Sequence, residues 1–238
     1  MREWEWSDSE KAFYRLGERL VPDVRTLAQL RPVLREENAS GPAEAYYMYR
    51  GANLPQHATL FTGCVLRYDI TVLPAAKYGG EFVKTVGHFH PKKGEHTYPE
   101  VYEVLEGEAH YLLQDDSRVM VFDAKPGDKV VVPPDFGHVT INPGKNTLVM
   151  ANIVSPAFSS DYSVFAEKRG AAFYCLENGW VENPHYAGFS MTREKPGKTN
   201  CPFFTRARSM YEIFCGSPGE FSFLNEPETF FTGDNLKY

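Results

Sequence analysis

The feature that most constrains the fold is a long series of short strand-like runs that begins near Ala45. Each run is rich in Val, Tyr, Phe and Thr, and glycine or proline separates it from the next. The runs include "TGCVLRYDITVLP", "EVYEVLEG", "AHYLLQ", "RVMVFDA", "DKVVVPP" and "TLVMANIV". Strands at this spacing, with no helices between them, are typical of an antiparallel sandwich or barrel. We therefore predict an all-β antiparallel fold, in which Gly107 closes a hairpin between two of the strands.

The two ends of the chain differ from this central region. Residues 7–36 place apolar side chains, among them Phe13 and Leu16, at helical spacing and predict short helices. Towards the other end, "ARSMYEIF" predicts a short helix among loop-like, aromatic segments. We expect three regions: an N-terminal helical arm over residues 1–44, a barrel over residues 45–185, and an irregular C-terminal extension over residues 186–238 that packs on the barrel or on a partner subunit.

Charge and composition exclude several classes of partner. The chain has 238 residues and a formal charge of −6, and its Lys and Arg residues form no basic run. Nucleic acid is therefore not an expected partner. No stretch approaches the roughly 18 consecutive apolar residues of a membrane span, so no membrane contact is expected. The acidic start "MREWEW" lacks the apolar core of an export signal, and we expect a cytoplasmic protein whose widely spaced cysteines are buried thiols.

A second feature is the concentration of histidine in residues 85–113. His88 and His90 are two apart in an apolar strand-like run, so their side chains leave the same face. Glu100 begins the next run, and His138 follows a double proline further along. Imidazole and carboxylate are costly to bury unless they pair or bind something. Three imidazoles and one carboxylate facing into a barrel predict a site for a divalent transition metal, such as iron, manganese, nickel, zinc or copper.

These stretches resemble the two sequence motifs of the cupin superfamily. "GHFHPKKGEHTYPEVYEVLEG" resembles the first motif and "GDKVVVPPDFGHVTIN" resembles the second. The resemblance implies a cupin double-stranded β-helix, which is an antiparallel jelly-roll barrel, with His88, His90, Glu100 and His138 as metal ligands. The gap between His90 and Glu100 is longer than in the family and also contains Glu95. The E-x6-G spacing to the hairpin glycine favours Glu100, and Glu95 stays the alternative ligand.

The resemblance extends to the cupin-type glucose-6-phosphate isomerases first known from archaea. It rests on "TVGHFHPK", "EVYEVLEG", "PPDFGHVTIN" and "DYSVFAEKRGA", and it covers roughly residues 45–185. It implies interconversion of glucose 6-phosphate and fructose 6-phosphate, a reaction of glycolysis and gluconeogenesis, by a homodimer with one divalent metal per chain. Fe²⁺ is the expected metal, with Mn²⁺, Ni²⁺ or Zn²⁺ as alternatives.

The resemblance also implies roles for individual residues. Glu100 would be the catalytic base as well as a ligand, and Tyr102 would hydrogen-bond the sugar or simply pack in its strand. The ligands of the substrate phosphate would be Thr71, Thr85, the Gly87 amide and Tyr162. Where the family often carries a histidine shortly before that tyrosine, this chain has Ser160, so the ring-opening residue is not assigned. Lys92 is a further phosphate candidate, and His96 is either a solvated loop residue or one that faces the substrate.

Two other functions stay open at this point. A cupin oxygenase with an iron site of three histidines and one glutamate would use the same donors. A non-catalytic cupin that binds a sugar phosphate would keep the barrel without turnover. The threonines beside the metal motif favour a phosphorylated ligand over an apolar one. The sequence does not separate proton transfer through Glu100 from a metal-assisted hydride shift.

Overall fold

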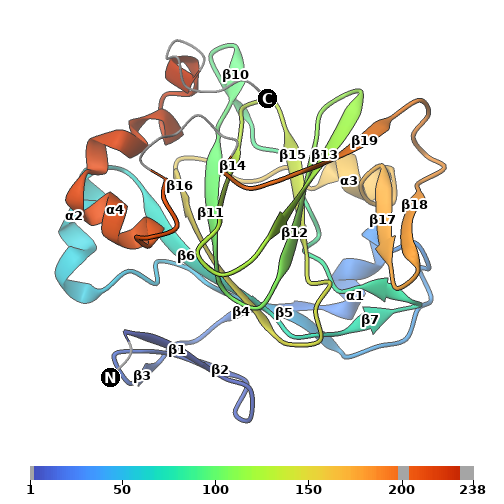
Figure 1. Ribbon diagram of the computed structural model, residues 1–238, viewed down its shortest axis with the longest axis horizontal. Helices are drawn as coiled ribbons and strands as arrows, with labels where there is room; N and C mark the ends of the chain where they lie inside the picture. Colours follow the sequence, from blue (N-terminus) through green and yellow to red (C-terminus); the bar gives the residue numbers. More distant parts are fainter. Residues whose placement is uncertain (1–2, 198–203, 231–238) are drawn as a thin grey trace.

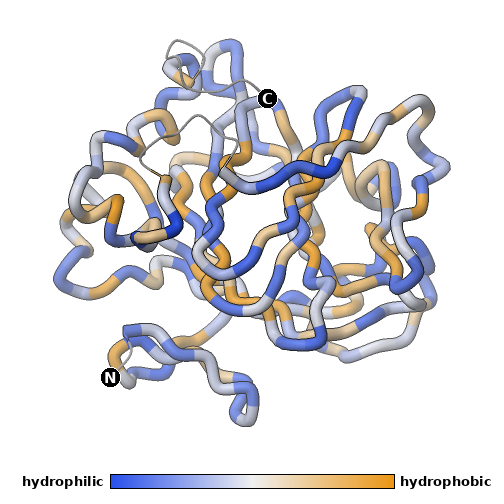
Figure 2. The backbone as a smooth tube through the Cα atoms, in the orientation of Figure 1, coloured by the Kyte–Doolittle hydropathy of each residue, from blue (hydrophilic) through white to orange (hydrophobic). Residues whose placement is uncertain are grey.

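The structure, a computed structural model, describes residues 3–197 and 204–230. Two sheets face each other across a buried apolar core (Figure 1). The larger sheet has the strand order β14-β11-β16-β6-β5-β4, with bounds Lys129–Val132, Glu100–Glu106, Leu148–Val154, Arg67–Leu73, Glu44–Tyr49 and Asp23–Thr26. The smaller sheet has the order β15-β12-β13-β19, with bounds Gly137–Ile141, Ala109–Gln114, Arg118–Ala124 and Ser190–Glu194. Figure 2 shows hydrophobic residues recurring along these strands.

The order of strand pairing is that of a jelly roll. β11 pairs with β14 and β16 in one sheet, while β12 pairs with β13 and β15 in the other, and all four pairs are antiparallel. The predicted all-β cupin barrel is therefore confirmed. The hairpin predicted at Gly107 is wrong, because β11 and β12 lie in different sheets. Gly107 turns the corner between them at a φ of +81°, where an added Cβ would lie 2.5 Å from the carbonyl oxygen of Thr147.

The helices predicted for residues 7–36 are mostly wrong. The segment begins in a small sheet of β1 (Trp4–Ser7), β2 (Ala12–Arg15) and β3 (Glu18–Arg19), and β4 then joins the larger sheet. Helical residues are confined to α1 (Leu27–Leu30) and η1 (Arg31–Val33) within this range. Isolated helices this short are marginal in water, whereas pairing of β4 with β5 satisfies the backbone directly. Leu16 is 47% exposed, so the apolar spacing did not mark one buried helical face.

Further short elements lie beside and above the barrel. A side sheet has the order β18-β17-β8-β7, with bounds Gly179–Glu182, Phe173–Leu176, Glu81–Phe82 and Lys77–Tyr78 (Figure 1). β9 (Lys92–Lys93) and β10 (His96–Thr97) form a hairpin, and α3 is Ser163–Glu167. Buried Lys84 links the side sheet to η1. Its ammonium group contacts Glu81 of β8 and donates to the carbonyl oxygen of Val33 at 2.6 Å.

Helical segments cover the outer face of the larger sheet (Figure 1), and we call them the outer layer. They are η2 (Pro55–His57), α2 (Ala58–Gly63), α4 (Met210–Gly216), η3 (Pro218–Leu224) and η4 (Pro227–Phe230). The helix predicted at "ARSMYEIF" is confirmed from Met210, and a capping box between Ser209 and Glu212 starts it. Phe214 is fully buried and stacks on Phe61 with ring centroids 4.3 Å apart. The helical segments from Met210 to Phe230 thus pack on the outer face of the sheet that carries Glu100.

The cysteines are less uniformly buried than expected. Cys175 is buried, whereas Cys64 and Cys215 are half-buried, and all three are free thiols. Cys201 lies outside the described residues. Among the residues that the structure describes, no helix combines the length and the apolar character needed to cross a membrane.

Candidate metal centre and its cavity

Three separate segments bring four metal-type donors together inside the barrel. His88 and His90 lie on an extended segment that is bridged to β15 through paired backbone hydrogen bonds between His88 and His138. Glu100 is the first residue of β11, and His138 is the second of β15. One ligand atom from each of the four residues lies within 4.8 Å of the others. The structure therefore brings together all four residues that the motifs predicted as ligands.

The geometry of this cluster suits a bound cation better than it suits hydrogen bonds among the four side chains. The Nε2 atoms of His88 and His90 lie 3.1 Å apart, and two imidazole nitrogens share at most one proton between them. Glu100 Oε2 lies 3.3 Å from His90 Nε2 and 3.2 Å from His138 Nε2. It is buried and has no partner with hydrogen-bond geometry among the described residues. Three nitrogens and one oxygen converging in this way suit a divalent transition metal.

Burial and mutual contact also set suitable protonation states. Burial lowers the pKa of His88 well below its usual value, and the imidazoles of His138 and His90 act in the same direction. Burial likewise lowers the pKa of His138. Burial alone would raise the pKa of Glu100, but the side chains of His138 and His90 outweigh it and hold that pKa well below its usual value. Neutral imidazoles and an ionised carboxylate are the forms that bind metals.

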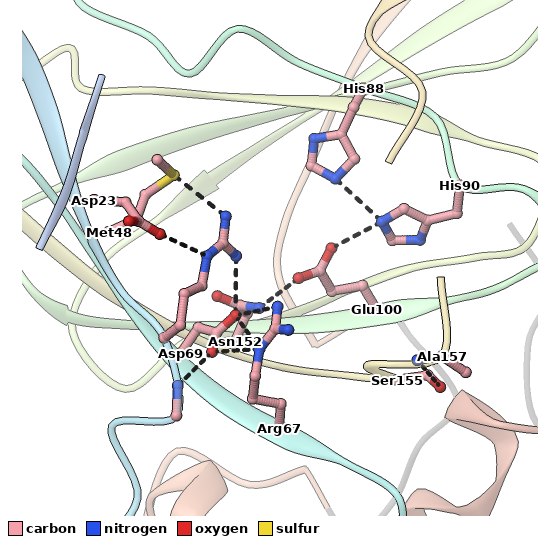
Figure 3. Close-up of polar contacts among 12 residues, drawn as sticks. Asp23, Met48, Arg67, Asp69, His88, His90, Glu100, Asn152, Ser155 and Ala157 are labelled. Atoms are coloured by element: carbon pink, nitrogen blue, oxygen red, sulfur yellow. Dashed lines mark hydrogen bonds and ion pairs between the residues drawn. The ribbon is translucent and has the colours of Figure 1, made fainter. Parts of the chain in front are cut away.

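Neighbouring groups orient two of the four donors. His90 Nδ1 lies 2.7 Å from the carbonyl oxygen of Tyr98, and because a carbonyl only accepts, Nδ1 carries the proton and Nε2 keeps its lone pair. Asn152 Nδ2 donates to Glu100 Oε1 at 2.6 Å, which leaves Oε2 facing the histidines (Figure 3). The sequence reasoning missed Asn152. Its signal is a polar residue in the otherwise apolar run "LVMANIV".

The cluster opens into a cavity of about 640 Å³, counting the space open to solvent at its mouth. Its lining includes five of the residues predicted to bind substrate, namely Thr71, Thr85, Gly87, Tyr102 and Tyr162, and it also includes Ser160. The Thr85 hydroxyl accepts from the Thr140 amide at 3.0 Å, so its own proton is available to a ligand. The Tyr102 hydroxyl lies 3.1 Å from His138 Nε2, beside the metal donors.

Gly87 allows the backbone to pass close to the barrel wall. Its φ is +77°, and an added Cβ would lie 2.5 Å from the Cγ2 of Val139. A side chain at this position would therefore meet both backbone strain and a steric clash. The glycine of the "GHFH" string keeps the backbone next to the cavity immediately before His88.

The other candidates from the same loop lie elsewhere. Glu95 is exposed, and the donor cluster contains Glu100 instead. His96 pairs with Asp135, with Nδ1 and Oδ2 2.6 Å apart, and it does not line the described cavity. Lys92 is exposed on β9 and is likewise absent from the lining of that cavity.

Two arginines in the cavity wall were also missed. Arg50 follows β5 and Arg67 begins β6, and both contact the buried Asp69 (Figure 3). Arg67, Asp69 and Thr71 alternate along β6, so they share the face that lines the cavity. The strand period could have revealed this row once Thr71 was placed inside the barrel.

Comparison with known proteins agrees with this geometry. Residues 24–188 match the family model for glucose-6-phosphate isomerase (GPI). The glucose-6-phosphate isomerase of Pyrococcus horikoshii is 35% identical over 125 residues, which are 51% of this chain and 65% of that protein. The Thermococcus litoralis enzyme of the same name is 34% identical over 51% of this chain and 64% of its own length. The chain thus spans just under two thirds of these relatives.

A solved structure of oxalate decarboxylase from Bacillus subtilis is 18% identical, with a TM-score of 0.37 over 49% of this chain and 27% of that one. The family match is far more extensive than this likeness. It begins in β4, runs through all four metal donors and ends beyond β18, so it covers more than half of the chain. The protein belongs to the glucose-6-phosphate isomerase family.

Proposed function

We propose that this protein interconverts glucose 6-phosphate and fructose 6-phosphate in a metal-dependent reaction. One observation carries the proposal: three of the four metal-type donors line the same cavity as the threonines, glycine and tyrosine predicted to bind a phosphate. His138, the fourth donor, lies 3.2 Å from Glu100, which is one of those three. Membership of the family supports the reaction, as do the names of relatives that are 34–35% identical to this chain over 125 aligned residues. We assign the protein to the cytoplasm, to sugar metabolism through glycolysis and gluconeogenesis, and to a homodimeric state.

We assign His88, His90, Glu100 and His138 as the ligands of one divalent metal, with Fe²⁺ as the first choice and Mn²⁺, Ni²⁺ or Zn²⁺ as alternatives. When bound, such an ion would act as a Lewis acid that offsets negative charge developing on the oxygens at C1 and C2 of the sugar. The donor set fits this role because it supplies three neutral nitrogens and one carboxylate, and so leaves net positive charge at the site.

We assign Glu100 as the base that carries the proton between C1 and C2. Its carboxylate is ionised and buried, and its Oε1 is fixed by Asn152 at the edge of the cavity. A fixed and ionised carboxylate can accept a carbon-bound proton without first reorganising. Tyr102 lies within the same cavity, and its hydroxyl is placed to hydrogen-bond a sugar oxygen when His138 Nε2 is engaged elsewhere.

We assign the substrate phosphate to Thr71, Thr85, the Gly87 amide and Tyr162. Hydroxyl and amide donors bind phosphate through charge-assisted hydrogen bonds. Thr85 already accepts from Thr140, so the orientation of its hydroxyl is fixed by the barrel. Ser160 lines the same cavity where related proteins often have histidine, and we leave the ring-opening group unassigned.

Assays on one preparation separate this function from its alternatives. Fructose 6-phosphate should be converted to glucose 6-phosphate, and removal of metal should abolish the conversion. Oxygen uptake without isomerisation would identify an oxygenase, and binding of the sugar phosphate without turnover would identify a binding protein. The polar lining, with its arginines and threonines, favours the isomerase over an oxygenase that acts on an apolar substrate.

A further inference from the structure

A compact cationic cluster lies in the cavity wall and takes no part in the proposed proton transfer. Asp69 is only 1% exposed and is contacted by two guanidinium groups. Arg50 Nη1 donates to Asp69 Oδ2 at 3.0 Å, and Arg67 Nε donates to Oδ1 at 2.8 Å. The Gly51 amide donates to the same carboxylate at 2.9 Å. Asp69 is therefore fully engaged, and it holds both arginines at the cavity.

The cluster carries net positive charge. The two guanidinium groups contact one buried carboxylate, that of Asp69. Glu100, assigned above as a metal ligand, acts on Arg50 at longer range, and Asp23 is 72% exposed and lies 4.0 Å from Arg50. Water screens a pair of that kind strongly. The side chains of Arg50 and Arg67 are 43% and 34% exposed, so part of each guanidinium remains open to a ligand. Planar guanidinium groups bind phosphate and carboxylate through paired hydrogen bonds.

The position of the cluster relates it to one end of a bound sugar. Asn152 pairs with Asp69 across β6 and β16, and it also holds Glu100. Figure 3 shows Arg67 and Asp69 on one side of Glu100, with His88 and His90 on the other. Thr85 and Gly87 immediately precede the histidines in the chain. Thr71 of the proposed phosphate site and Arg67 lie on opposite sides of Asp69 along β6. A sugar whose phosphate lies at Thr71, Thr85 and Gly87, and whose C1 and C2 lie at Glu100, would therefore point its C1 end towards the arginines.

We propose that Arg50 and Arg67 form a second anion subsite, which accepts a phosphate or carboxylate at the C1 end of a 6-phosphorylated sugar. This inference rests on the proposed function for the direction in which the sugar lies. A ketose 1,6-bisphosphate would occupy both anion sites, but its C1 oxygen is esterified and cannot become an aldehyde oxygen. Such a sugar therefore binds as an inhibitor that is not turned over.

The test measures binding by calorimetry to the full-length protein saturated with Mn²⁺. Fructose 1,6-bisphosphate probes a second phosphate, 6-phosphogluconate probes a carboxylate, and fructose 6-phosphate is the singly phosphorylated reference. Wild type should bind at least one of the two doubly charged sugars more tightly than the reference. In Arg67→Gln and Arg50→Gln that preference should fall by about tenfold or more, the scale of one lost charge-assisted hydrogen bond.

Arg193→Gln is the matched control. Arg193 pairs with Asp123 at 2.6 Å on the outside of the barrel, so this variant removes the same charge from an Arg–Asp pair remote from the cavity. It should keep the wild-type preference. Thermal unfolding and bound metal, measured on every variant, separate lost binding from misfolding. Arg67→Lys keeps the positive charge but replaces the guanidinium group, so it tests whether charge alone supports the preference.

Two results would overturn the subsite. One is a wild type that prefers neither doubly charged sugar, and the other is a preference that is equal in wild type and in the folded Arg50 and Arg67 variants. An isomerase assay on the same samples reads the proposed function separately. Absence of turnover, together with a preference that the arginine variants lose, would reject the isomerase assignment and retain the subsite.

Discussion

The two faces of the larger sheet are built from the same strands but carry different chemistry. Along β6, Ile70 and Val72 point outwards into the apolar outer layer, whereas Thr71 lines the cavity and Asp69 lies on the same face of the strand. Along β16, Ile153 faces the outer layer and the neighbouring Asn152 faces the cavity. All of these side chains are buried. The two faces therefore do not differ in burial. They differ in the groups that their side chains contact.

The two faces should contribute differently to stability and to function. The outer face buries apolar side chains against aromatic rings from α2, α4 and η3, so it should contribute mainly to stability. The inner face buries polar groups that are costly unless they are paired. Its polar side chains hold one another in contacts such as Asn152 with Glu100. We therefore expect variants on the inner face to lose binding and turnover, and variants on the outer face to lose stability.

The largest effect should come from removing a metal donor that meets the inner face from the smaller sheet. His138→Ala deletes one of the four donors, and loss of a direct ligand should exceed the roughly 10–100-fold weakening typical of groups that only support ligands. We expect most of the metal, and with it the activity, to be lost. Metal analysis after gel filtration measures this, with His88→Ala as a parallel variant. Full metal content in both variants would remove these residues from the site.

A variant on the outer face should lose stability and keep its metal. Phe214→Ala removes a fully buried ring that stacks on Phe61, and such truncations cost about 3–5 kcal/mol. We expect a clearly lower free energy of unfolding by urea titration, with metal content and KM close to wild type in the folded protein. A loss of metal affinity in folded Phe214→Ala would show that the outer layer also shapes the cavity.

A third prediction separates binding from chemistry on the inner face. Glu100→Gln should retain the fold and much of the substrate affinity, but kcat should fall by about 100-fold or more, the usual scale for a general base. Because an amide is also a poorer ligand than a carboxylate, the assay needs saturating metal and a metal count on the same sample. In deuterated water, the wild type should place deuterium on the carbon that receives the proton.

Near-normal turnover of metal-loaded Glu100→Gln, together with wild-type product free of deuterium, would contradict this role. Glu100 would then be a ligand alone, and a hydride shift would replace proton transfer.

The smallest effect should come from one donor of the phosphate site. Thr85→Ala removes a charge-assisted hydrogen bond worth about 1.5–3 kcal/mol and should raise KM for fructose 6-phosphate by about tenfold or more. Thr62→Ala is the matched control, because Thr62 is exposed on α2 and its hydroxyl donates to its own helix at the carbonyl oxygen of Ala58. Equal binding of inorganic phosphate by Thr85→Ala and wild type would place the phosphate elsewhere.

Sequence patterns predicted the four metal donors better than the residues that surround them. The alternation of side chains along a strand, together with the motif spacing, identified residues that the fold brings within hydrogen-bonding distance, such as His88 and His90. Asn152 and Arg50 were missed, because their roles depend on strand partners that are distant in the chain. The N-terminal helices were predicted wrongly because a short apolar spacing does not reveal whether a sheet edge, here that of β5, is available to pair with.

The domain boundaries at residues 44 and 185 stay a prediction. β4 lies before the first boundary and β19 after the second, yet each joins one of the two barrel sheets. These contacts join residues that are far apart in the chain, and no local sequence pattern predicts them. Contacts in the outer layer also join distant residues. The hydroxyl of Tyr211 in α4 accepts a hydrogen bond from the Leu54 amide and forms another with His57 Nδ1.

One titration asks whether the four donors that meet at the inner face hold a single metal on which turnover depends. Protein stripped of metal is titrated with Fe²⁺ under anaerobic conditions, and bound metal and conversion of fructose 6-phosphate to glucose 6-phosphate are measured at each step. We expect no conversion without metal, a linear rise in conversion with occupancy, and a plateau at one ion per chain. Conversion by the stripped protein, or activity that does not change as the site fills, would contradict it.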